Sequence, residues 1–158
     1  MVKPKKPRLY KVNKKMIEGS CLCGGVKFQI EGEVTPIQKC HATRCRKATG
    51  GAYAPELLTS IEGFTWLKGK ELITVYAAPL INAPPLYKRA FCKKCGSPLP
   101  VEIEGTSFML LLAGTLDSNP GVSEFRHAFT GQKACWHEIT DNLPSYEEEP
   151  PVPEEYKQ

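Results

Sequence analysis

The feature that most constrains this chain is a pair of cysteine turns that lie far apart in the sequence. One turn is Cys21-Leu22-Cys23-Gly24-Gly25 and the other is Cys92-Lys93-Lys94-Cys95-Gly96. Each turn places two sulfurs close together, and the glycines permit a positive-φ backbone that lets amide N–H groups point at thiolates. Four thiolates form a closed, tetrahedral site for structural zinc. A metal joining the turns closes a loop of roughly 70 residues, so we predict that folding depends on it.

The four cysteines could instead form two unrelated buried pairs or disulfide bonds. The chain has seven cysteines, an odd number, and its first residues show no apolar signal region. We therefore expect cytoplasmic thiols and metal ligands rather than a secreted disulfide scaffold. No apolar run approaches the roughly 18 residues that a membrane helix needs, so we expect no membrane partner.

Charge divides the chain into three parts. Residues 1–16 hold seven basic side chains and no acidic one, which predicts a disordered or loosely attached basic arm. Residues 147–158 hold five glutamates and three prolines, which predicts an acidic, proline-rich tail. Residues 17–146 are nearly neutral and suit one zinc-binding domain without a groove for nucleic acid. The basic arm leaves a nuclear location open beside the cytoplasmic one.

Within 17–146 the pattern is that of short strands joined by glycine and proline turns, which predicts an all-β domain. The strand predictions cover 26–30, 64–67, 72–76 and 108–113. Because only Lys68-Gly69-Lys70 and its neighbours separate strand 64–67 from strand 72–76, these two strands are expected to form a hairpin. The run 108–113 is apolar throughout and is expected to be a fully buried central strand. The one helix candidate is 45–49, which ends at Gly50.

A second cluster of reactive residues precedes this short helix, in Cys40-His41-Ala42-Thr43-Arg44-Cys45-Arg46-Lys47. The helix start and the basic side chains should lower the pKa of the two thiols. The cluster is then an electropositive thiolate site that suits an anionic substrate. The alternative is two free cysteines beside a run of solvated basic residues, and the spacing does not decide between them.

The three cysteine clusters, in this order, resemble the glutathione-dependent formaldehyde-activating enzyme family, which also includes centromere protein V. The resemblance covers about 19–113, and 131–144 is similar to the end of some bacterial and fungal members. It implies a β-tent of antiparallel sheets with two zinc ions, one of them structural and held by Cys21, Cys23, Cys92 and Cys95. It also implies a carbon-sulfur lyase of the S-(hydroxymethyl)glutathione synthase type, acting on glutathione or another thiol adduct.

The chain departs from this family at the second zinc site. The family pattern there is Cys-x-Cys-x-x-Cys, whose three thiolates leave a fourth position for the glutathione thiol. Cys40 and Cys45 match the outer positions, but the middle one is Ala42, which cannot bind metal. Either the site is empty or another side chain completes it. The nearest candidate is His41, and the more distant ones are His127, Cys135 and His137.

The predicted catalytic residues are Cys40, His41 and Cys45. Arg46 and Lys47 are predicted to bind the carboxylates of a glutathione-like substrate, unless they form a solvated basic turn. Three functions stay open: a zinc-dependent lyase, a non-catalytic zinc-stabilised binding module, and a relative that has lost the second zinc and uses its two cysteines as a thiol pair. Because of Ala42, we expect one firmly bound zinc, at most a weakly held second one, and low turnover.

Overall fold

The structure, a computed structural model, describes residues 16–77 and 87–153. Most of the basic arm and part of the acidic tail therefore lie outside the described residues. In chain order the strands and the helix are β1 (Ile17–Ser20), β2 (Lys27–Ile30), β3 (Ile37–Cys40), α1 (Thr43–Thr49), β4 (Ala54–Ser60), β5 (Phe64–Lys68), β6 (Ile73–Ala77), β7 (Lys88–Cys92), β8 (Pro98–Leu99), β9 (Val101–Glu102), β10 (Phe108–Leu112) and β11 (Glu124–Ala128).

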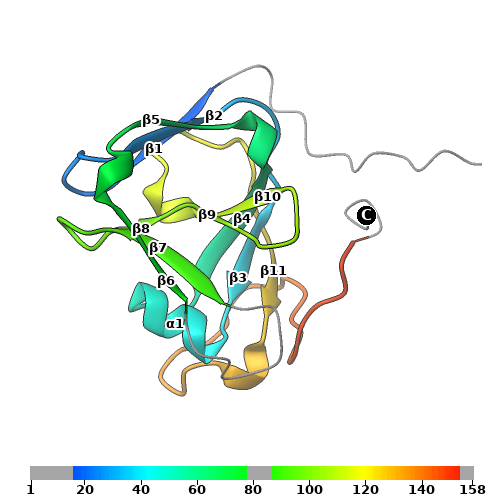
Figure 1. Ribbon diagram of the computed structural model, residues 1–158. Coiled ribbons are helices and arrows are strands. Elements are labelled where there is room, and N and C mark those ends of the chain that lie inside the picture. The colour runs from blue at the N-terminus through cyan, green and yellow to red at the C-terminus, as the bar shows by residue number, and fades with distance from the viewer. Residues whose placement is uncertain (1–15, 78–86, 154–158) are drawn as a thin grey trace, which may run out of the picture.

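The strands form three sheets, ordered β1-β2-β5, β11-β3-β4-β10-β9 and β6-β7-β8. All neighbours are antiparallel except β11 and β3, which run parallel. Figure 1 shows the β1-β2-β5 sheet across one end of the molecule and α1 at the other. The prediction of a mainly β fold with antiparallel sheets is confirmed.

The main core lies between the first sheet and the five-stranded sheet. It is built from Phe28 and Ile30 on β2, Leu57 on β4 and Leu111 on β10, all essentially without exposed surface. Burial alternates along β2, as its sequence predicts. On β10, however, only Met109 and Leu111 are buried, so the expected fully buried strand is wrong. One face of this strand is half-buried although its sequence is apolar throughout.

The predicted hairpin of 64–67 with 72–76 is also wrong. Strand β5 pairs with β2, whereas β6 pairs with β7 in a different sheet. Gly69, at φ 78°, starts a 3-10 turn that turns the chain from one sheet to the other. The turn packs on the first cysteine loop, where a side chain at position 69 would overlap the carbonyl oxygen of Gly25. The turn is thus determined by tertiary contact rather than by strand pairing.

After β11 the chain makes a loop and then lies beside that strand, with residues around Ser145 running parallel to it. The backbone N–H of His127 donates to the carbonyl of Pro144, and the N–H of Tyr146 donates to the carbonyl of His127. The first residues of the predicted tail continue this contact, since the N–H of Phe129 donates to the carbonyl of Glu148. The domain boundary at 146 stays a prediction. Among the described residues, no helix has the length and apolar character needed to cross a membrane.

Candidate metal centres and the adjoining pocket

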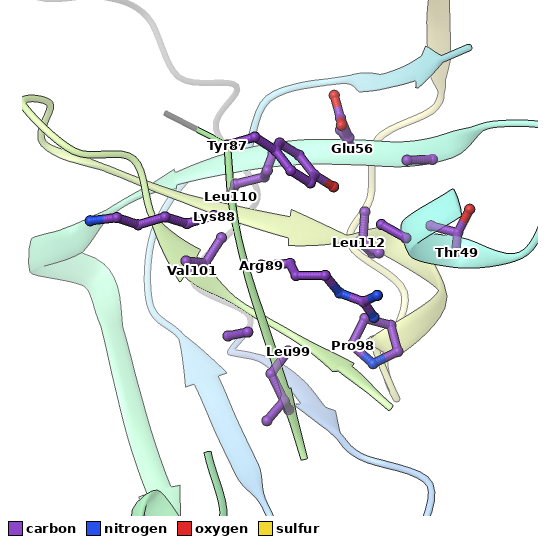
Figure 2. A pocket seen from close by; sticks show the side chains of 13 residues that line it. Thr49, Glu56, Tyr87, Lys88, Arg89, Pro98, Leu99, Val101, Leu110 and Leu112 are labelled. Carbon is purple, nitrogen blue, oxygen red and sulfur yellow. The ribbon is translucent and has the colours of Figure 1, made fainter. Parts of the chain in front are cut away.

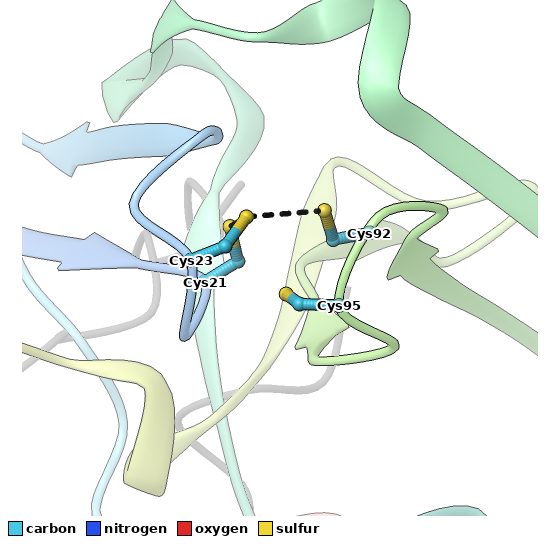
Figure 3. A group of neighbouring side chains, drawn as sticks. All are labelled: Cys21, Cys23, Cys92 and Cys95. Carbon is cyan, nitrogen blue, oxygen red and sulfur yellow. Dashed lines mark hydrogen bonds between the residues drawn. The ribbon is translucent and has the colours of Figure 1, made fainter.

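The two cysteine turns of the sequence meet in space. Cys21 and Cys23 lie in the turn between β1 and β2, whereas Cys92 ends β7 and Cys95 lies in the turn between β7 and β8. Gly24, at φ 67°, and Gly96, at φ 75°, provide the left-handed positions of the two turns. Figure 3 shows the four side chains converging, and their sulfurs all lie within 4.8 Å of one another. This cluster could hold one metal ion.

Hydrogen bonds favour the thiolate form of Cys21 and Cys95. The pKa of Cys23 is instead raised to about 11, because the hydrogen bond from the Gly25 backbone, which lowers it, is outweighed by the hydrogen bond with Cys21 and by smaller effects in the same direction. The N–H of Val26 donates to Sγ of Cys21 at 3.2 Å. Ser97 joins the two turns, because its Oγ accepts from the N–H of Leu22 at 2.9 Å and lies 3.3 Å from Sγ of Cys95. Hydrogen bonds from the Ser97 hydroxyl and N–H lower the pKa of Cys95 to about 5. All four cysteines are free, with Cys21 and Cys23 sulfurs 3.5 Å apart, well beyond a disulfide bond.

A second group of metal-ligating atoms lies beside α1. Sγ of Cys40, at the end of β3, is 3.1 Å from Sγ of Cys45. Sγ of Cys45 is 3.3 Å from Oε1 of Glu56 on β4. The three ligand atoms lie within 4.8 Å of one another, so this group too could hold a metal ion. Ala42 lies alongside, buried at the first turn of α1.

Glu56 is a member of this group that the sequence did not single out, and strand pairing explains its position. In the antiparallel pair of β3 and β4, Cys40 is opposite Ala54 and Gln38 is opposite Glu56. Alternate residues of a strand share a face, so Cys40 and Glu56 lie diagonally on the same face. The signal in the sequence was a single acidic residue within the largely apolar run 54–58. Only the pairing of the strands shows that this acid faces the cysteines.

The electrostatics of this group differ from the sequence-based expectation. The sequence predicts lowered thiol pKa values, but the pKa of Cys45 is raised by its hydrogen bond with Cys40, by burial and by the charge of Glu56. Burial likewise raises the pKa of Glu56, although a hydrogen bond from Gln38 opposes this. Two thiols and a carboxyl group thus lie together with little access to water. Sulfur and carboxylate oxygen are both zinc ligands, so the donor set fits a zinc ion.

His41 does not join this group, because it lies on the other side of β3. Its Nε2 lies 2.8 Å from Nδ1 of His127, whose Nε2 is 2.9 Å from a carboxylate oxygen of Asp141. Burial, and then the neighbouring His127 and His137, lower the pKa of His41 to about 4. The three histidines of the chain thus gather in a separate polar cluster. Cys135, another candidate for the missing ligand, is exposed and belongs to neither group of metal-ligating atoms.

The two predicted carboxylate-binding residues also lie elsewhere. Nε of Arg46 donates to the carbonyl oxygens of His41 and Gln132, at 3.3 and 3.2 Å, so this side chain ties α1 to the segment after β11. Lys47 is exposed. Arg44 instead stacks on the ring of Tyr87, with its Cζ 4.9 Å from the ring centroid.

Comparison with known proteins identifies the family. The profile of the family described as glutathione-dependent formaldehyde-activating enzyme matches residues 16–132. The chain belongs to this family. A protein of Halomonas elongata, provisionally named a glutathione-dependent formaldehyde-activating enzyme, is 31% identical over 128 residues, covering 78% of this chain and 81% of its own. Among solved structures, the crystal structure of a Rhodobacter sphaeroides protein is similar, with 22% identity, a TM-score of 0.49, and coverage of 68% of this chain and 98% of that one.

In this member of the formaldehyde-activating enzyme family a hollow borders the second group of ligands. Figure 2 shows it between β7, β4 and β10, with Glu56, Tyr87 and Arg89 among the side chains that line it. Tyr87 is half-buried, and burial together with the nearby charges of Cys45 and Glu56 raises the pKa of its hydroxyl. The phenol therefore keeps its proton near neutral pH and can donate a hydrogen bond.

Proposed function

We propose that this chain is a zinc-dependent carbon-sulfur lyase that forms and cleaves the bond between sulfur and the hydroxymethyl carbon of S-(hydroxymethyl)glutathione. The observation that carries this proposal is the convergence of Cys40, Cys45 and Glu56 at the edge of a hollow. Three protein ligands and an open fourth position are typical of catalytic zinc, whereas four thiolates are typical of structural zinc. Glu56 supplies the ligand that Ala42 cannot.

Zinc bound here would favour the thiolate form of a substrate thiol and act as a Lewis acid toward the carbonyl oxygen of formaldehyde. Cys40, Cys45 and Glu56 would hold the ion. In the forward reaction the substrate thiol gives up its proton, its sulfur forms a bond to the carbonyl carbon, and the carbonyl electron pair moves to oxygen, which takes up a proton. Tyr87, a protonated phenol in the same hollow, would donate a hydrogen bond to that oxygen.

The test is the exchange of formaldehyde into glutathione, followed by exchange NMR with 13C-labelled formaldehyde. The native, zinc-loaded protein should accelerate both formation and cleavage of S-(hydroxymethyl)glutathione above the spontaneous rates. Glu56→Ala should abolish the acceleration. Glu102→Ala, which removes an exposed glutamate from β9 in the same sheet, should retain it. Spontaneous rates in the presence of zinc-loaded native protein would contradict the proposal.

A second candidate function rests on the separation of Cys40 and Cys45. Their sulfurs are 3.1 Å apart, close enough for a reversible disulfide if no metal intervenes. In that case peroxide would oxidise the pair, with a loss of two hydrogens per chain that mass spectrometry detects. Zinc-loaded protein should resist this oxidation under the lyase proposal, because both thiols are then metal ligands. Rapid oxidation of zinc-loaded protein would favour the thiol pair.

A further inference from the structure

Arg89 places an unneutralised positive charge in the hollow beside Glu56. It lies on β7 and is half-buried, and Figure 2 shows its guanidinium directed into the hollow on the side of Pro98. Its one ring contact is with Phe91, at 5.5 Å. Among the described residues the ion pairs involve Lys39, Lys88 and His127, and none involves Arg89. A half-buried guanidinium without an acidic partner is a ready site for an anion.

Arg44 on α1 adds a second positive charge beside Tyr87, one of the residues that line the hollow. Its guanidinium stacks on Tyr87, and its charge lowers the pKa of Glu56 in opposition to burial. The charge of Arg89 likewise lowers the pKa of the Tyr87 hydroxyl, against the larger effect of burial. Two arginines from different elements, Arg44 on α1 and Arg89 on β7, therefore place their charges near Tyr87 and the candidate metal ligands. Arginine suits this role, because its planar fork matches a carboxylate.

The space beyond Arg89 is large enough for more than a thiol group. The hollow adjoins a second one of about 500 Å³, and the two share Thr49, Pro98 and Leu112 as lining residues. This volume is in the range of sites for small organic ligands. The hollow that Glu56 and Arg89 line is itself only about 30 Å³, so the rest of a substrate with its sulfur near Glu56 would extend into the larger space, whose lining includes Pro98 beside Arg89.

We propose that Arg89, together with Arg44 beside Tyr87, binds a carboxylate of the substrate and so restricts the enzyme to carboxylated thiols. The position of the sulfur, toward Cys40 and Glu56, rests on the proposed function. The carboxylate site itself rests on the two guanidiniums, neither of which has an ion-pair partner among the described residues. It takes the place of the Arg46 and Lys47 site that the sequence predicts.

The test compares matched thiols by calorimetric titration of the full, zinc-loaded chain. The acid 3-mercaptopropionate should bind about tenfold or more tightly than the alcohol 3-mercapto-1-propanol, which lacks the charge. Arg89→Gln should remove this preference, Arg89→Lys should keep part of it, and Arg44→Gln should reduce it. Lys47→Gln should leave it unchanged. Zinc content and circular dichroism show whether each variant is folded. If Arg89→Gln does not fold, Arg89→Lys and Arg44→Gln still test the inference.

Two results would overturn the inference: equal affinities of the native protein for the acid and the alcohol, or a preference that Lys47→Gln removes and Arg89→Gln leaves intact. A different result would contradict the lyase proposal alone. In that result the protein prefers the acid and the preference depends on Arg89, but exchange of formaldehyde into glutathione stays at its spontaneous rate. Salt should weaken binding of the acid and not of the alcohol, as a charged contact requires.

Discussion

At the scale of single residues, we propose that Glu56 replaces, from a neighbouring strand, the metal ligand that Ala42 cannot provide. Ala42 removes a thiolate from the loop, and Glu56 on β4 lies where its carboxylate reaches Cys45. His41, adjacent to Cys40 in sequence, faces the opposite way and binds His127. Proximity in sequence was therefore a poor guide here, since neighbouring residues of an extended chain point to opposite sides.

This replacement predicts a rescue. Glu56→Ala should lose the second zinc, because two thiolates hold the ion weakly. Adding Ala42→Cys to that variant should restore binding through a third sulfur. In the native background, Ala42→Cys should retain the zinc and lower turnover, since a fourth protein ligand would fill the open position. Zinc content and exchange NMR on the three variants check this; a double variant without the second zinc would contradict it.

Asp141 carries a second prediction at this scale. Its carboxylate accepts hydrogen bonds from Lys39, at 2.7 Å, and lies against His127, and together these contacts hold its pKa well below the usual range. A lowered carboxyl pKa stabilises the fold above the ordinary value of about 4, and this contribution is lost as the pH falls further. Asp141→Asn should lower the melting temperature at pH 7 by a few degrees. The difference in melting temperature between the native protein and Asp141→Asn should become smaller below about pH 4. If that difference stays constant with pH, the charge of Asp141 does not stabilise the fold.

At the scale of elements, much of the fold could be predicted from local pattern. Strand β2, the two cysteine turns and the end of α1 at Gly50 follow from alternation and glycine placement. The sequence pattern could not predict that β5 and β6 belong to different sheets, because this depends on packing of the Gly69 turn against Gly25. Glu56, Tyr87 and Arg89 were missed for a related reason: their role depends on which strands pair and face one another.

The Gly69 turn can be tested against a matched glycine. Gly69 and Gly105 have the same φ of 78°, but only at Gly69 would a side chain overlap the backbone of the cysteine turn. Gly105→Ala should cost about 1 kcal/mol, the strain of a left-handed alanine. Gly69→Ala should cost clearly more in free energy of unfolding and should also loosen the nearby four-cysteine site. Equal losses in chemical denaturation would show that the turn does not depend on this contact.

At the scale of the whole molecule, the four cysteines connect two sheets. Cys21 and Cys23 belong to the β1-β2-β5 sheet, and Cys92 and Cys95 to the β6-β7-β8 sheet. The two turns are also joined by the hydrogen bond from Leu22 to Ser97 and by a small apolar cluster that includes Val26 and Leu99. Structural zinc contributes on the order of 10 kcal/mol, comparable with the stability of a small domain. Metal and fold should therefore be lost together.

Stepwise removal of metal should separate the two sites. The site with three protein ligands should release its zinc to a chelator first, with turnover lost and the circular dichroism unchanged. The four-cysteine site should release its zinc later, and the circular dichroism signal of the β-sheets should decrease at the same time. Cys92→Ser should give aggregated protein or protein with lowered zinc content. Zinc-free, soluble and natively folded Cys92→Ser protein would contradict a structural role.

The most direct test of Glu56 as the third ligand is the number of zinc ions per chain, measured by native mass spectrometry on freshly purified protein. We predict two firmly bound ions in the native chain, whereas the sequence alone predicts one and a weak second. Glu56→Ala should carry one, and the control Glu102→Ala should carry two. One ion in the native chain, or two in Glu56→Ala, would contradict the assignment of Glu56 as the third ligand.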